Sequence, residues 1–305
     1  MKTTSRRFGL LAAPGFTALL LFNACKKETS GSELSAQDEE QTTVISSQAD
    51  AEASLAFEDV FDNVIGVNND VGVGGTGIFG SKAQGSLEDV ARTTGCFTVN
   101  ITRINAQEMF PLRVVLDFGN GCTALDGHVR SGKIITEYSG RLVVPGKFST
   151  TTFENYKIDS FLVQGTYKIT NTSTATNRQF TTDVIDGKIS RPSGDYTNWA
   201  SHRIITQSEG VLTPDFPLDD EFKIEGTGNG KVKRGGYLIA WQSEISEPLR
   251  KRFTCRWISK GVIKIRRERL ASSSVWVGIL DYGAGDCDNK AILKINNIDH
   301  QISLN

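Results

Sequence analysis

Apolar and polar residues alternate with a period of two through much of the chain after residue 96. The pattern is clear at residues 97–101, 161–169 and 298–304. Such alternation predicts β-strands with one buried face. Thirty glycines and only two methionines further favour strands and turns over helices. The sequence therefore predicts an all-β fold of antiparallel sheets, with enough residues for one large β domain or two small ones.

Further strands are predicted at residues 112–116 and 222–225. A third runs from 133 to 138 and continues through Gly140 to residues 142–144. The pair Asn296-Asn297 is typical of a hairpin turn.

Two stretches near the ends of this β region resemble each other. Val115-Leu116-Asp117-Phe118-Gly119-Asn120-Gly121-Cys122 matches Ile279-Leu280-Asp281-Tyr282-Gly283-Ala284-Gly285-Asp286-Cys287 with one inserted residue. Each copy also has a cysteine upstream. The similarity favours a two-copy module, packed either as two linked β units or as one long twisted sheet.

The N-terminus has the features of a lipoprotein signal. Lys2, Arg6 and Arg7 precede an apolar run at residues 8–22, and Ala24 precedes Cys25. The run is too short to be a permanent membrane span. We expect cleavage after residue 24 and lipid on Cys25, which would anchor the chain to the membrane.

Four further cysteines, Cys96, Cys122, Cys255 and Cys287, remain in an exported chain. An even number predicts two disulfides, for which three connectivities exist. The internal similarity favours Cys96–Cys122 and Cys255–Cys287. Each would stabilise the fold by roughly 3–4 kcal/mol in the chain-entropy model.

Between the signal and the β region, residues 25–47 form the predicted lipidated cysteine and flexible tether, because residues 26–47 are polar and lack a buried-face pattern. Residues 48–94 comprise the predicted helix and a glycine-rich connector. The apolar stripe Ala53, Phe57, Val60, Phe61 and Val64 predicts an amphipathic helix near residues 47–64, with Ser47 as its N-cap. The β-rich domain occupies residues 95–305.

Several stretches resemble a group of lipoproteins from Bacteroidota that brings no known activity. They are the 116–122 stretch, Arg130-Ser131-Gly132-Lys133-Ile134, Phe153-Glu154-Asn155-Tyr156 and residues 281–289. The resemblance covers most of residues 95–305. It implies location and fold rather than function. In that group, a short charged run after the cysteine can direct export to the cell surface, and Lys26-Lys27-Glu28 is compatible with this.

The loop at residues 281–289 is the strongest candidate for a ligand site. Asp281, Asp286, Asp288 and Asn289 supply three carboxylates and an amide, the ligands that calcium prefers. Turn-forming Asp and Asn residues give the same composition, and a structural turn is the favoured interpretation. No other cofactor is predicted.

Three other groups of charged or titratable residues also have a functional and a structural interpretation. Asp219-Asp220-Glu221 could supply part of a glycosidase carboxylate pair, but a solvated loop is favoured. His128, His202 and His300 lack the spacing of a helical zinc site. A basic band could face an anionic polysaccharide or lipid headgroups, although a strand face paired with acids is favoured. The band comprises Arg250, Lys251, Arg252, Arg256, Lys260, Lys264, Arg266, Arg267 and Arg269.

Charge and composition complete the functional prediction. Cleavage after residue 24 removes three bases and no acid, which leaves 31 bases against 35 acids. This balance disfavours a nucleic-acid partner. We expect a lipid-anchored outer-membrane protein, with the cell surface as a further location, that is not an enzyme and binds a polysaccharide or protein. The alternatives are a carrier of lipid or another hydrophobic ligand and a glycan-acting hydrolase.

Overall fold

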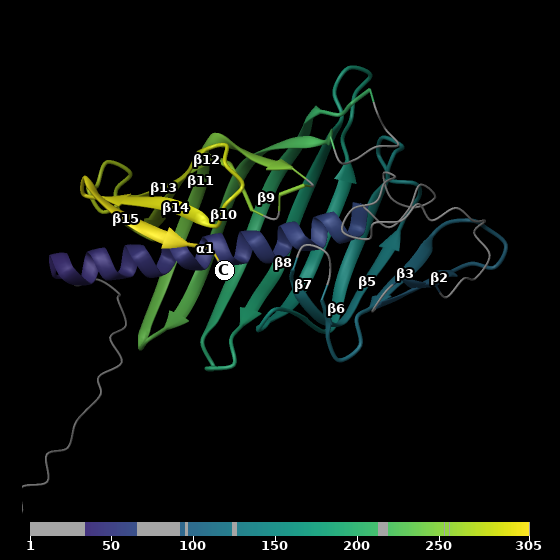
Figure 1. Ribbon diagram of the computed structural model, residues 1–305, viewed down its shortest axis with the longest axis horizontal. Coiled ribbons are helices and arrows are strands. Elements are labelled where there is room, and N and C mark those ends of the chain that lie inside the picture. The colour runs from purple at the N-terminus through teal and green to yellow at the C-terminus, as the bar shows by residue number, and fades with distance from the viewer. Residues whose placement is uncertain are drawn as a thin grey trace, which may run out of the picture.

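The fold is a single antiparallel sheet curved around one long helix (Figure 1). The computed structural model describes residues 34–65, 92–94, 97–123, 127–212, 219–252, 254–255 and 257–304. Helix α1 spans Ala36–Ile65, and every described strand follows it in the chain. The predicted fold class, an antiparallel all-β protein with one N-terminal helix, is confirmed.

The strands are β1 (Arg92–Thr94), β2 (Phe97–Arg103), β3 (Leu112–Asp117), β4 (Cys122–Thr123), β5 (Val129–Tyr138), β6 (Phe148–Ile158), β7 (Phe161–Asn171), β8 (Gln179–Ser190), β9 (Tyr196–Glu209), β10 (Glu221–Arg234), β11 (Tyr237–Arg252), β12 (Lys260–Arg267), β13 (Gly278–Ala284), β14 (Lys290–Ile295) and β15 (Ile298–Ser303). They form one 15-stranded sheet in chain order, except that β4 pairs only with β5 beside this path.

The strand predictions agree with the structure except at one turn. Residues 97–101, 112–116, 161–169 and 222–225 lie in strands, and Asn296 and Asn297 form the β14–β15 turn with φ of 48° and 62°. The extension to residues 142–144 was wrong, because these residues turn between β5 and β6. There Leu142 is buried while Val143 and Val144 are exposed, so a short apolar run resembled a strand.

Helix α1 begins eleven residues before the expected Ser47. Ser35 caps it, accepting a hydrogen bond from the Asp38 backbone N–H at 3.2 Å. Ser47 lies fully buried within the helix, and the segment from Ala36 to Ser47 is helical rather than part of a tether. Within the described part of the chain, no helix is long and apolar enough to span a membrane.

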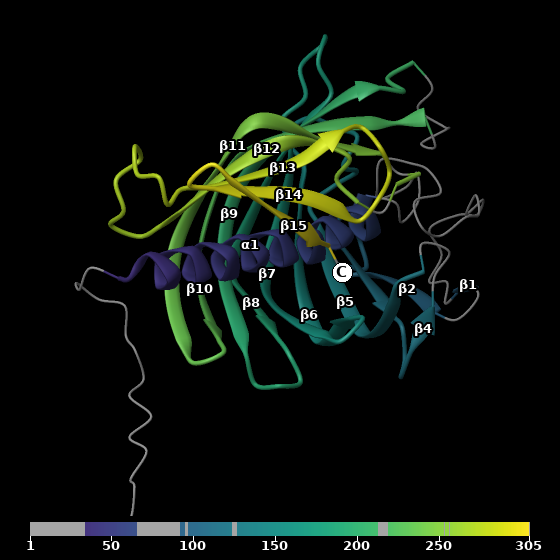
Figure 2. The same cartoon turned by 60° about the vertical axis from the view of Figure 1, so that its left-hand side comes forward.

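The polar composition that suggested a tether here has another cause. Twenty-one of the 30 helical residues are buried, including Glu39, Thr42, Ser46 and Asp50. Figure 2 shows why: the helix lies against the concave face of the curved sheet, and β13–β15 fold over it. A helix enclosed in this way needs partners for its polar side chains. Strand residues bind Glu39 and Asp50, whereas the Thr42 and Ser46 hydroxyls donate to carbonyls of the helix itself.

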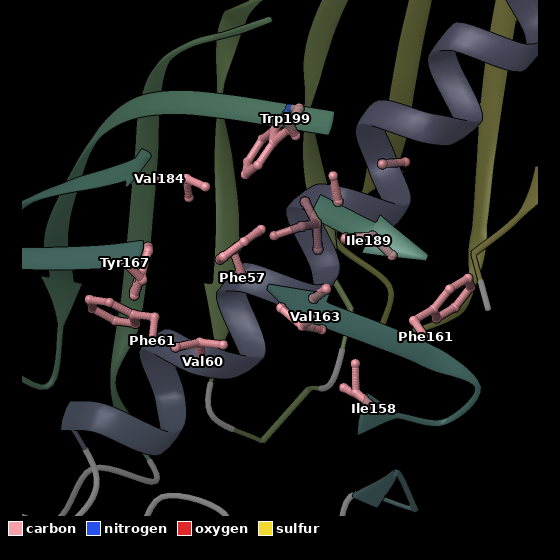
Figure 3. Close-up of a cluster of buried hydrophobic side chains, with 14 of the residues drawn as sticks. Phe57, Val60, Phe61, Ile158, Phe161, Val163, Tyr167, Val184, Ile189 and Trp199 are labelled. Carbon is pink, nitrogen blue, oxygen red and sulfur yellow. The ribbon is translucent and has the colours of Figure 1, made fainter. Parts of the chain in front are cut away.

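The apolar stripe predicted on the helix does face the core. Phe57, Val60 and Phe61 project toward the strands (Figure 3). The Phe57 ring lies 5.7 Å from the Trp199 ring and 5.9 Å from the Tyr167 ring, between centroids. The concave side of the sheet is therefore filled by the protein's own helix.

The two similar sequence stretches form matching turns near opposite ends of the sheet. Asp117 Oδ1 accepts a hydrogen bond from the Gly119 N–H at 2.9 Å, and Asp281 Oδ1 accepts one from the Gly283 N–H at 2.8 Å. Both glycines have positive φ, 57° and 88°. Of the two arrangements left open, one continuous sheet is the one observed.

The Cys255–Cys287 disulfide, predicted from this similarity, is present. Cys122 is also disulfide-bonded. Cys96 lies outside the described residues, so its pairing with Cys122 stays a prediction.

Candidate functional site: a polar hollow behind a buried helix

Acidic side chains along α1 are bound by basic side chains of the sheet. Asp59 pairs with Arg130 of β5 and accepts a 2.6 Å hydrogen bond from the Tyr156 hydroxyl. Glu58 pairs with Arg203 at 2.7 Å, and Asp62 with Lys251 at 2.9 Å. Arg267 holds Glu39 near the other end of the helix. These pairs fix the helix against strands from β5 to β12.

Burial sets the electrostatics of this network. Desolvation raises the pKa of the Glu58 and Asp62 carboxyls, although Arg203 and Lys251 oppose the shift. Burial alone would lower the pKa of Lys251, but the neighbouring Asp62 and Glu58 outweigh it and raise that pKa. The buried charges therefore depend on one another, and removing one partner leaves the other unpaired.

Asp50 connects the middle of the helix to two tryptophans. Its Oδ1 accepts hydrogen bonds from the indole N–H groups of Trp199 and Trp241, both at 3.0 Å, and from the Ser243 hydroxyl at 2.8 Å. All four side chains are buried. They fix the inner face of β9, β10 and β11 in one arrangement.

Glycines of β10 make room for this cluster. A Cβ at Gly228 would lie 2.8 Å from Ser243 Oγ and 3.2 Å from Trp199 Nε1, and one at Gly230 would lie 2.5 Å from the Trp241 ring. Only glycine allows helix and tryptophans to approach the strand so closely.

A hollow of about 880 Å³ lies over the same strands and extends to the loop between β12 and β13. The exposed or half-exposed side chains that line it alternate with the buried residues of β9–β12, and so belong to the opposite face. They carry amides, a hydroxyl and charges of both signs. On β9–β12 they are Asn198, Ala200, Thr227, Asn229, Lys231, Ala240, Gln242, Glu244, Lys264 and Arg266, and the lining also includes Asp186 of β8 and Glu268, Ser272 and Val277 after β12.

Strand register arranges these side chains in rows. Asn229 pairs with Ala200 on one side and Gln242 on the other, and Gln242 pairs with Arg266. Lys231 likewise lies between Asn198 and Ala240. The short side chains of Ala200 on β9 and Ala240 on β11 leave space beside Asn229 and Lys231. Arg266 donates to Gln242 Oε1 at 2.8 Å and to the Leu270 carbonyl at 3.2 Å, which fixes the rim.

A second, smaller groove of about 290 Å³ lies where α1 meets the strand ends. Its floor includes Glu52, whose carboxylate is bound by Arg191 and, at 2.6 Å, by Arg234. The C-terminal residues Ile302 and Leu304 form another wall. Because these arginines bind Glu52 of the helix, we interpret the groove as part of the contact between helix and sheet.

The candidate calcium loop, for which a structural turn was the favoured interpretation, forms turns. Asp281 accepts from the Gly283 N–H and Asp288 from the Lys290 N–H, the latter at 2.9 Å. Among the described residues, no three His, Cys, Asp or Glu side chains gather closely enough to hold a metal ion. Calcium binding by Asp281, Asp286, Asp288 and Asn289 stays a prediction.

The Asp219-Asp220-Glu221 stretch lies at the start of β10. The Gln207 amide donates to Asp220 Oδ1 at 2.6 Å, and Arg250 lies 3.4 Å from Glu221. Desolvation raises the pKa of Asp220 to about 7, with a smaller opposing effect from Arg178. These contacts tie the two carboxyls to neighbouring strands.

The histidines are dispersed. His128 Nδ1 lies 2.8 Å from Asp159, His202 Nδ1 lies 2.7 Å from Asp183, and His300 Nε2 lies 3.7 Å from Glu40. Of these, only His202 is exposed. It neighbours the hollow, because it pairs across strands with Thr227.

The basic band is divided between the two faces of the sheet. Lys251 and Arg267 point inward to acids of α1, whereas Lys264 and Arg266 line the outer hollow. Arg250 pairs with Glu221 across β10 and β11, as expected for a strand face paired with acids. Pairing with the buried helix was not anticipated, because these acids had been assigned to a tether and one helix face.

Cys25 lies outside the described residues. Sequence reasoning missed the hollow. It also missed the tryptophan cluster on the inner face, although Gly228 and Gly230, spaced two apart after the predicted strand at 222–225, could have indicated a backbone approached closely on that face.

Comparisons with protein-family models, with curated proteins and with solved structures find no match to this chain. The case for function therefore depends on the signal-like N-terminus and on the geometry described above.

Proposed function

We propose that the protein is a lipid-anchored lipoprotein of the bacterial outer membrane that binds a polysaccharide in the hollow over β9–β12, without catalysis. One observation carries the proposal: the concave face of the sheet is filled by α1, whereas the opposite face has an open polar hollow over β9–β12. The signal-like segment and Cys25 support the anchor, and the charged residues after Cys25 are compatible with the cell surface.

The lining of the hollow suits a hydroxyl-rich polymer. Asn198, Asn229 and Gln242 offer amide donors and acceptors, and Lys231 adds a cation. Behind them the Asp50–tryptophan cluster holds the strands rigid, so little order has to be gained on binding.

The alternatives receive less support. A lipid carrier needs an apolar cavity, whereas Phe57 and Phe61 occupy the concave side. A hydrolase needs two convergent carboxylates, whereas Asp220 and Glu221 are engaged by Gln207 and Arg250. A protein ligand would use the same face and is the second outcome of the test.

Affinity electrophoresis of residues 26–305 through gels containing dextran or alginate tests the proposal. These probes represent neutral and uronic-acid polymers. We expect at least one to retard the protein, and the double variant Asn198→Ala/Asn229→Ala to migrate faster in that gel.

Gln164→Ala is the matched control, because Gln164 is an exposed amide on β7, outside the lining of the hollow. It should migrate like the unsubstituted protein. Retardation by neither polymer, or equal retardation of the double variant, would count against polysaccharide binding and direct the search to a protein ligand.

A further inference from the structure

We propose that the end of the molecule at the start of α1 rests on the phospholipid surface that holds the anchor. This N-terminal tip consists of Leu270, Val275 and Trp276 in the β12–β13 loop and Ile298 at the start of β15. The proposal rests on the lipid anchor of the proposed function and adds the orientation of the folded part and its contact with headgroups.

The segment that connects Cys25 to the helix is short. Leu34, the first described residue, lies nine positions after Cys25 in the chain. Fully extended, this segment reaches at most about 30 Å. The predicted tether of residues 26–47 would have reached about 70 Å, so the earlier start of the helix brings the folded part much closer to the membrane.

The tip lies beside the start of α1. The Thr43 hydroxyl donates to the Trp276 carbonyl at 3.1 Å, and Thr43 lies about 10 Å along the helix from Ala36. His300, two residues after Ile298, lies 3.7 Å from Glu40. The Asn296 N–H donates to the Val275 carbonyl at 2.9 Å, which joins the loop to the β14–β15 turn.

The tip exposes apolar side chains. Val275 is 57% exposed and Ile298 is 54% exposed, and Leu270 and Trp276 are partly exposed. Exposed apolar side chains with a tryptophan favour the headgroup region of a bilayer. Lys294 lies 3.7 Å from Asp299, so opposite charges accompany the apolar groups. We therefore expect a contact that depends little on salt.

The anchor makes this weak surface effective. A chain held within about 30 Å of the bilayer presents the tip at a high local concentration. The far end of α1, about 45 Å away along its axis, has no such constraint.

An environment-sensitive fluorophore on Val275→Cys tests the contact. Residues 26–305, oxidised and carrying an N-terminal hexahistidine, are held on phosphatidylcholine vesicles that contain a nickel-chelating lipid. This lipid supplies the anchor, so the result does not depend on lipid on Cys25, which intact-mass measurement of the membrane form tests separately.

Val144→Cys is the control, because Val144 is 42% exposed in the turn that follows β5. That strand ends near the other end of α1, where Tyr138 donates to the Val64 carbonyl. Labelling of the unsubstituted protein gives the background.

On vesicles we expect at least a twofold rise and a blue shift of the emission at position 275, with quenching by spin-labelled lipid and no change at position 144. No change at 275, or an equal or larger change at 144, would overturn the proposed orientation.

Discussion

Asp50 is the residue on which the centre of the molecule depends. Its Oδ1 accepts the indole protons of Trp199 and Trp241 together with the Ser243 hydroxyl proton. Removing the acceptor would leave three buried donors without this partner. The same cluster supports the floor of the hollow, so its loss should affect both stability and binding.

Asp50→Ala should lower the free energy of unfolding by about 3–5 kcal/mol, because three buried donors lose their acceptor. Asp50→Asn keeps an acceptor oxygen and should cost less. Urea unfolding followed by tryptophan fluorescence measures both. A loss no larger than that of Gln41→Ala, an exposed substitution on the same helix, would contradict the role given to Asp50.

Asp220 should couple stability to pH. Its pKa is raised to about 7 in the folded protein, against about 4 for an ordinary aspartate. The protonated form is thus favoured by folding, so its contribution is present at low pH and lost as pH rises through about 7.

Relative to Asp220→Asn, which resembles the neutral carboxyl, the unsubstituted protein should lose stability progressively from pH 4 to pH 7, and the difference should then level off. Urea midpoints across this range measure it. A difference independent of pH would show that the Asp220 pKa is not raised.

At the scale of elements, the helix combines an apolar stripe with buried acids. The Phe57 ring lies among Phe153, Tyr167 and Trp199, with centroids 5.7–6.2 Å apart. Helix and sheet are thus one packed unit (Figure 3).

Phe57→Ala should destabilise the protein by about 3–5 kcal/mol, because it removes a buried ring and leaves a cavity. Gln41→Ala should change stability by no more than about 0.5 kcal/mol. Thermal or urea unfolding distinguishes the two. A similar small effect for both would mean that the helix does not contribute to the core.

The sequence predicts the elements whose signals come from neighbouring residues, and it misses those that depend on contacts between residues distant in the chain. Alternation and turn residues such as Asn296-Asn297 are local, so they located strands and one hairpin. The start of the helix depends on partners distant in sequence, such as Arg267 for Glu39. A polar segment with such partners cannot be told from a tether by its own composition.

The candidate site was harder to predict for the same reason. The hollow is assembled from rows that cross β9 to β12, and a single strand shows only its exposed half. From the sequence of β10 alone, Thr227, Asn229 and Lys231 resemble the solvent-exposed face of any strand. Their meaning appears only when Ala200 and Ala240 lie beside them in register.

At the scale of the whole molecule, buried tyrosines are spread over the sheet from β5 to β13. Tyr138, Tyr156, Tyr167 and Tyr282 are buried, and desolvation raises the pKa of each phenol above its usual value near 10. Their stabilising contribution is therefore present below pH 10 and declines as pH rises further, because the unfolded chain loses these protons first.

Absorbance at 295 nm during alkaline titration should show these four of the six tyrosines ionising only as the fold is lost, in step with circular dichroism. Ionisation of all six before unfolding would contradict the burial of the four.

The central claim is that α1 is a permanent part of the core and that ligands bind on the opposite face. Hydrogen–deuterium exchange of residues 26–305, with and without phospholipid micelles, tests it most directly. The account predicts that amides of residues 49–64 exchange as slowly as those in the middle of β9–β11, and that lipid leaves them unchanged. Faster exchange of the helix than of these strands, or a further increase with lipid, would show that α1 leaves the sheet and would favour a hydrophobic-ligand carrier.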